Sequence, residues 1–271
     1  MTEDRNDRNE LLFGAEGQKR ITETKVTVVG NGGLGAAVDQ DLAYLGVLDY
    51  RLIDGDIVSA TSLNRLRGAT PADMGRKKVI VAKTMVEAIQ PDANVEAIDG
   101  WLADAPDAIA KADVVFGCLD KDIDRVELIK FCIAAGVPFF DLATDVDDRH
   151  GPIAYGGRVL WSGTGERCPF CMDLLDQDGM RRDVLPEAAR TDHHRIYGIS
   201  KDVLDAGGPS VVSINGVVAS LAVTEFMAYA TRLREPQPLL TYRAERGIVR
   251  QSIDPPYAGC PYCSRWHRAA A

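Results

Sequence analysis

Short apolar runs alternate with helix-like stretches along the first 145 residues of the chain. β-branched and aromatic runs predict strands at residues 26–29, 50–53, 95–98, 113–119 and 138–142. Apolar spacing and glycine or proline stops predict helices at residues 33–45, 77–89, 105–110 and 123–135. Because strands and helices alternate, the predicted fold class is α/β, with a doubly wound, mostly parallel sheet of the Rossmann type.

The pattern changes from about residue 153. A strand-like run at residues 155–161 is followed by a polar stretch, then by an apolar helix at residues 209–233. Polar residues interrupt residues 211–227, so we interpret that helix as a buried one and not as a membrane span. Residues 239–242 and 248–253 predict a closing hairpin, which makes the sheet's C-terminal extension antiparallel.

A glycine cluster follows the first predicted strand directly. Gly30, Gly32 and Gly35 occupy the three glycine positions of G-x-G-x-x-G, with Gly33 between them, and the helix that follows would present free N–H groups to an anion. About twenty residues further on, Asp54 ends the second strand, where a carboxylate can accept ribose hydroxyls. This arrangement predicts a nucleotide site but does not by itself identify the nucleotide.

Charged residues after other strands narrow the choice of nucleotide. Arg65 and Lys78 follow the second strand, and Asp120 follows the fourth. Two cations suit the oxygens of a triphosphate, and a carboxylate suits magnesium. A nicotinamide cofactor would need neither Lys78 nor Asp120, so the pattern favours ATP with Mg²⁺.

Four of the six cysteines form two Cys-x-x-Cys pairs, Cys168/Cys171 and Cys260/Cys263. Four thiolates on two loops match a closed, structural zinc site, which would tie the C-terminus to the middle of the chain. Redox dithiols or disulfides are the alternative. A redox pair usually opens a helix after the first strand of a thioredoxin-like unit, and neither pair does so.

Size and charge restrict the class of protein. With 271 residues, 46% of them hydrophobic, the chain can bury a full core in one domain. Its net charge of −9 argues against a general nucleic-acid surface. The charged N-terminus has no apolar signal-peptide segment, so a cytoplasmic location is expected. We expect an N-terminal arm (1–20) and a single domain (21–271), with a nucleotide-binding half (21–145) and a substrate and zinc half (146–271).

Taken together, the motifs resemble those of the adenylating family of MoeB, ThiF and HesA, which is related to the adenylation domain of ubiquitin-activating enzymes. The resemblance covers nearly the whole chain. It is carried by Arg5-x-x-Arg8, the glycine turn, Asp54-x-Asp56-x-Val58, Leu63-Asn64-Arg65, Gly75-Arg76-Lys77-Lys78-Val79, Gly117-Cys118-Leu119-Asp120 and both cysteine pairs.

The resemblance implies a homodimer in which ATP and magnesium adenylate a C-terminal carboxylate. By motif position, Asp54 would bind ribose, Arg65 and Lys78 the phosphates and Asp120 magnesium, while Arg8 would reach the other subunit's ATP as an arginine finger. Asp56, Ser62 and Asn64 belong to the same nucleotide-binding motifs. The chain departs from the family pattern at Ser62, where asparagine is common, and at Asn6 and Asn9 beside Arg8.

Several relatives pass the activated carboxylate to a cysteine located after the first Cys-x-x-Cys pair. Residues 172–208 contain no cysteine, and the two remaining ones, Cys118 and Cys132, lie in apolar surroundings where thiols are inert. We therefore expect adenylation without an enzyme thioester. Such an enzyme also needs no general base, because a carboxylate is already ionised at pH 7.

The substrate and two other classes of protein stay open at this stage. Suitable substrates are a sulfur-carrier or ubiquitin-like protein, or a peptide with a free C-terminal carboxylate; the acidic surface makes a tRNA base the least attractive. The glycine turn and Asp54 alone also fit an NAD(P)-dependent oxidoreductase. A non-catalytic scaffold of the same fold is the third possibility.

Overall fold

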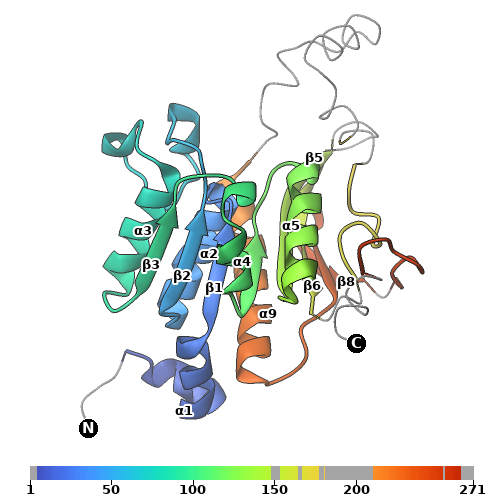
Figure 1. The fold of residues 1–271 in the computed structure, drawn as a ribbon, viewed down its shortest axis with the longest axis horizontal. Helices are drawn as coiled ribbons and strands as arrows, with labels where there is room; N and C mark the ends of the chain where they lie inside the picture. Colours follow the sequence, from blue (N-terminus) through green and yellow to red (C-terminus); the bar gives the residue numbers. More distant parts are fainter. Residues whose placement is uncertain are drawn as a thin grey trace, which may run out of the picture.

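The computed structural model describes residues 5–147, 153–163, 167–176, 180, 210–252 and 254–263. Within these residues the chain folds around one mixed sheet with helices on both faces (Figure 1). The strands are β1 (Lys25–Val29), β2 (Asp49–Ile53), β3 (Asn94–Ile98), β4 (Val114–Gly117), β5 (Phe139–Asp147), β6 (Ala154–Ser162), β7 (Leu239–Arg243) and β8 (Ile248–Gln251).

The order of the strands is β3-β2-β1-β4-β5-β6-β7-β8. The first five of these pair in parallel, and β6, β7 and β8 add an antiparallel extension. The chain order reverses between β1 and β4, which is the switch point where doubly wound sheets bind ligands. The predicted fold class, including the antiparallel C-terminal hairpin, is confirmed.

Helices cover the two faces of the sheet unequally. The long helices among those described are α1 (Asp7–Glu23), α2 (Gly33–Leu45), α3 (Lys78–Ile89), α5 (Asp122–Ala135) and α9 (Val212–Thr231), and α4 (Pro106–Ala110) is a short one. One core joins α2, α3 and α9 to the sheet, and a second joins α4 and α5 to the other face. Helix α1 lies at the end of the sheet where the parallel strands begin (Figure 1).

Helix α9 is long and apolar enough to cross a membrane by length and composition. In this structure it packs against α2, α1, β5 and β6. Val218, Ala219, Ala222 and Phe226 on its inner side are fully buried. These contacts are those of a core helix, as its interrupting polar residues predict.

The predicted boundaries mostly hold, because they rest on local signals. Helix α2 begins at Gly33 and ends at Leu45, followed by Gly46 with a φ of 101°, and α5 ends before Gly136 in the same way. The main difference is β5, which was expected to end at residue 142 but continues to Asp147. Its last five residues pair with β6, and that long-range pairing is not encoded in their polar local pattern.

Candidate active site

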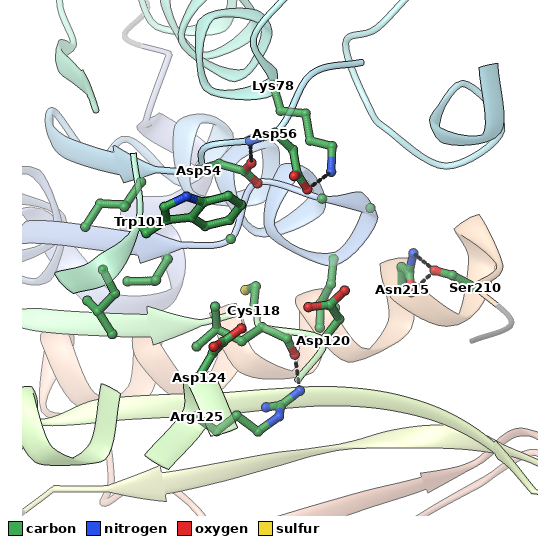
Figure 2. A pocket seen from close by; sticks show the side chains of 18 of the residues that line it. Asp54, Asp56, Lys78, Trp101, Cys118, Asp120, Asp124, Arg125, Ser210 and Asn215 are labelled. Atoms are coloured by element: carbon green, nitrogen blue, oxygen red, sulfur yellow. Dashed lines mark hydrogen bonds and ion pairs between the residues drawn. The ribbon is translucent and has the colours of Figure 1, made fainter. Parts of the chain in front are cut away.

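A pocket opens at the carboxyl ends of β1, β2 and β4, where the strand order reverses. Figure 2 shows acidic and basic side chains converging on it from several elements. The predicted site residues that line it are Gly30, Gly32, Gly33, Asp54, Asp56, Arg65, Lys78 and Asp120. The topology therefore brings together most of the residues that the sequence selected.

The glycine turn is shaped by close backbone approaches. Gly30 has a φ of +88°, and a Cβ there would lie 2.6 Å from the carbonyl oxygen of Cys118. A Cβ on Gly35 would lie 1.9 Å from the carbonyl oxygen of Gly30, so the first turn of α2 rests directly on the end of β1. Only glycine fits either position. As a result, the positive end of α2 points into the pocket.

Asp54 is held rigidly beside this turn. One carboxylate oxygen accepts the backbone N–H of Asn31 at 2.7 Å, and the other accepts that of Asp56 at 2.8 Å. Burial raises the pKa of Asp54, and the Asp56 N–H and the charge of Lys78 act against that rise. Each oxygen keeps further lone pairs, so the carboxylate is placed to accept ribose hydroxyls.

The two predicted phosphate-binding cations, Lys78 and Arg65, are both held by neighbouring groups. The Lys78 Nζ is 2.7 Å from a carboxylate oxygen of Asp56, and its side chain is 15% exposed. The Arg65 guanidinium donates to the carbonyl oxygen of Thr61 and, at 3.2 Å, to Asn64. Both cations are thus oriented by neighbouring groups while they line the cavity.

Asp120 follows β4 on the opposite wall, and a buried ionic network supports its backbone. Asp141 is 1% exposed and lies between Arg125 and Arg158. Arg125 also donates to the carbonyl oxygens of Leu119 and Leu142. Burial lowers the pKa of Arg158, while the charge of Asp141 opposes that effect. This network fixes the residue before Asp120 to the α5 and β5 side of the pocket.

Four predicted site residues do not line the pocket in this chain. Gly35 lies behind the turn, Ser62 is buried with its hydroxyl 3.0 Å from that of Ser59, and Asn64 contacts Arg65. Arg8 is exposed on α1, at the end of the sheet away from the pocket (Figure 1). Its assignment to a second subunit's site stays a prediction.

The pocket also contains residues that sequence reasoning did not select. The polar or aromatic ones are Trp101, Asp124, Arg125, Glu127, Thr144, Ser210 and Asn215. Asn215 is 1% exposed and donates to the Ser210 hydroxyl at 3.1 Å. The available signals were a polar residue inside an apolar helix for Asn215 and a position just beyond β3 for Trp101.

The four paired cysteines converge, as predicted, into one buried cluster. Their sulfur atoms all lie within 4.8 Å of one another. Cys168 is 3.7 Å from Cys260 and 3.8 Å from Cys171, and Cys171 is 3.8 Å from Cys263. A tetrahedron of Zn–S bonds of about 2.3 Å has edges of about 3.8 Å, whereas a disulfide is about 2.05 Å long. The donor set and its spacing fit zinc, and none of the four cysteines forms a disulfide.

The two other cysteines are buried, as expected. Burial raises the pKa of both Cys118 and Cys132 above the usual thiol value, so both are protonated at neutral pH. Cys118 nevertheless lines the pocket. All four histidines, at 150, 193, 194 and 267, lie outside the described residues, as does most of the polar stretch before α9.

Comparison with known proteins points to the same family as the sequence motifs do. The model of the ThiF family matches residues 6–261. The Escherichia coli molybdopterin-synthase adenylyltransferase is 37% identical over 165 residues, which cover 60% of this chain and 64% of that protein. The E. coli sulfur carrier protein ThiS adenylyltransferase is 29% identical over 147 residues, which cover 54% of this chain and 55% of that protein. Each match therefore spans less than two thirds of the curated relative's length.

Solved structures extend the similarity to nearly the whole fold. The crystal structure of E. coli MccB with ATP superposes with a TM-score of 0.72 at 20% identity. The match covers 97% of this chain and 75% of that one. At this level of identity the likeness concerns the fold.

Proposed function

Since the chain belongs to the ThiF family, we propose that it is an ATP-dependent adenylyltransferase. Its proposed substrate is the C-terminal carboxylate of a ubiquitin-like protein, a sulfur-carrier protein or a peptide. The names of the relatives support this class: one acts on the sulfur carrier protein ThiS, and another on molybdopterin synthase.

One observation carries the proposal: the pocket combines an anion-binding turn with Asp54, Arg65, Lys78 and Asp120 around a single cavity. A ribose, a triphosphate and a divalent cation each find the chemical partner they need there. An oxidoreductase would leave Lys78 and Asp120 without a role, and a non-catalytic scaffold would have no need for either.

In the proposed reaction, a substrate carboxylate oxygen attacks the α-phosphorus of ATP. The bond between that phosphorus and the oxygen leading to the β-phosphate breaks, and pyrophosphate leaves. Arg65, Lys78 and the N-terminus of α2 offset the negative charge that develops on the leaving group. No side chain has to remove a proton, so positioning and electrostatics account for the catalysis.

Two metals belong to the proposal. Asp120 and Asp124, which both line the pocket, offer the carboxylate oxygens that Mg²⁺ prefers, and bound magnesium would neutralise phosphate charge. Zinc would be held by Cys168, Cys171, Cys260 and Cys263, where a closed set of four thiolates makes it structural and not catalytic.

We further propose that the enzyme forms no thioester, works as a homodimer with Arg8 acting in trans, and is cytoplasmic. The double variant Cys118→Ala/Cys132→Ala should then keep its carboxylate-dependent exchange of pyrophosphate into ATP. Lost exchange in a variant that still folds and still binds ATP would contradict the thioester-free route.

The adenylation proposal is tested by calorimetric titration of the purified protein with Mg-ATP and, separately, with NADPH. We expect ATP to bind with a magnesium requirement, and Asp120→Asn to lose that requirement. Asp107→Asn is the matched control, because Asp107 is exposed on α4 and does not line the pocket. Binding of NADPH without ATP would overturn the proposal and favour an oxidoreductase.

A further inference from the structure

Trp101 is an aromatic side chain in the nucleotide pocket that the reaction above does not use. It follows the end of β3, is 61% exposed, and still lines the pocket. Figure 2 shows its indole next to Asp54, on the wall opposite Asp120 and Asp124. A largely exposed indole gains little of the free energy that burying its surface would provide. A ligand that covered the ring would supply that free energy.

The indole is held in place on one side. A Cβ at Gly55 would lie 2.9 Å from the ring atoms Cε2 and Cζ2 of Trp101, so the ring covers the backbone of Gly55. The backbone N–H of Trp101 donates to the Asp104 carboxylate at 3.2 Å, and the Trp101 carbonyl oxygen accepts the Asp104 backbone N–H at 2.9 Å, so the backbone that carries the indole is anchored. An indole that packs on Gly55 from an anchored backbone loses less conformational entropy than a free one when a ligand stacks on it.

Its neighbourhood identifies the part of the nucleotide within reach. Asp54, the ribose-binding candidate, is fixed by two backbone N–H groups, and its own N–H donates to the Ile98 carbonyl oxygen at the end of β3. A base is joined to ribose by one bond, so a nucleotide with its ribose on Asp54 carries its base close to the segment that follows β3. Leu102 and Leu119 add apolar surface to the same pocket.

Resting on the proposed function, we propose that Trp101 is the platform on which the purine base of ATP stacks. Stacking uses the π face of the base and not its hydrogen-bonding edge. Trp101 therefore contributes to affinity almost equally for ATP and GTP, and less for CTP, whose smaller ring covers less of the indole. It is a positioning residue for the base and takes no part in the bond changes at phosphorus.

The test compares Trp101→Ala and Trp101→Phe with the unaltered protein, using Mg-ATP and Mg-tripolyphosphate as calorimetric ligands. We expect Trp101→Ala to weaken ATP binding by about tenfold to a hundredfold, the range typical of lost base stacking. Trp101→Phe should restore most of that affinity, and tripolyphosphate, which has no base, should bind all three proteins equally.

ATP should also quench tryptophan fluorescence, and Trp101→Phe should abolish the quenching. Trp161→Phe, which replaces a buried indole, should keep it.

The possible results separate the two proposals. If the unaltered protein binds no ATP, the adenylation proposal falls, and the role of Trp101 falls with it. If it binds ATP and Trp101→Ala binds ATP as tightly, or if quenching persists in Trp101→Phe, the stacking role alone is overturned. If Trp101→Ala weakens tripolyphosphate as much as ATP, Trp101 supports the pocket wall and not the base, which also overturns it.

Discussion

Asp39 places a carboxyl group where water cannot reach it. The side chain is 0% exposed on α2, directly behind the glycine turn, and one of its oxygens accepts the Asn31 amide N–H at 2.7 Å. Burial raises its pKa from 3.8 to about 8, and the Asn31 bond only partly offsets the rise. Asp39 is therefore mainly protonated at pH 7 in the folded protein and ionised in the unfolded chain.

This difference makes the free energy of unfolding depend on pH. Between about pH 4 and pH 8 the folded state binds one more proton than the unfolded state, so stability falls as pH rises, by at most about 1.4 kcal/mol per pH unit. Asp39→Asn cannot ionise and should be more stable than the unaltered protein at pH 9 but not at pH 4. Urea unfolding of the two proteins at pH 4 and at pH 9 measures this difference in the free energy of unfolding.

Asp107→Asn again serves as the matched control, because that side chain is exposed on α4 and lies outside the pocket. Unfolding curves of Asp39→Asn that shift with pH in parallel with those of the unaltered protein would contradict the raised pKa.

At the scale of elements, the turn between β1 and α2 separates a packing role from a ligand-binding role. A Cβ on Gly35 would stand 1.9 Å from the Gly30 carbonyl oxygen. A Cβ on Gly32, whose φ is −75°, would have no neighbour within 4 Å among the described residues. The first position is constrained by the fold itself, and the second by the space that a phosphate needs.

We expect Gly35→Ala to be destabilised at the upper end of the ~1–3 kcal/mol typical of overpacking, because α2 must move away from β1. Gly32→Ala should keep its unfolding free energy and lose affinity for Mg-ATP, since its methyl group enters the pocket. Thermal unfolding and calorimetric titration of both variants distinguish these effects. Two variants with equal stability would contradict the assigned roles.

At the scale of the molecule, the cysteine cluster connects two segments that are 92 residues apart in sequence, at Cys168–Cys260 and Cys171–Cys263. The protein as purified should contain about one zinc ion per chain, because the four sulfur atoms are spaced for one tetrahedral ion. Removing a ligand should release the metal and its contribution to folding.

Cys260→Ser should therefore lose zinc and unfold about 5–15 °C lower, as expected for a loss of several kcal/mol in a chain of this size. Cys132→Ala, which replaces a buried cysteine outside the cluster, should keep its zinc. Metal analysis gives the zinc content of the two variants, and thermal unfolding gives their unfolding temperatures. A protein that contains no zinc and unfolds at the same temperature as Cys260→Ser would contradict a structural metal site.

The sequence by itself determined the features that depend on neighbouring residues. The order of strands and helices follows from side-chain periodicity, and the ends of α2 and α5 follow from Gly46 and Gly136, which adopt the left-handed conformation that stops a helix. The glycine turn, Asp54 and the cysteine pairs were likewise visible, since each motif lies within a few residues and its chemistry fixes its spacing.

Only the tertiary structure decided which distant segments meet. Asn215 and Trp101 enter one pocket from α9 and from the end of β3, and Arg125 reaches Asp141 and the Leu119 carbonyl from a single position on α5. The extra length of β5 depends on its partner β6. Such contacts result from the paths of whole elements across the sheet, which local periodicity does not encode. The sequence therefore predicted the chemical groups of the site, and only the structure determined the shape of the pocket that they line.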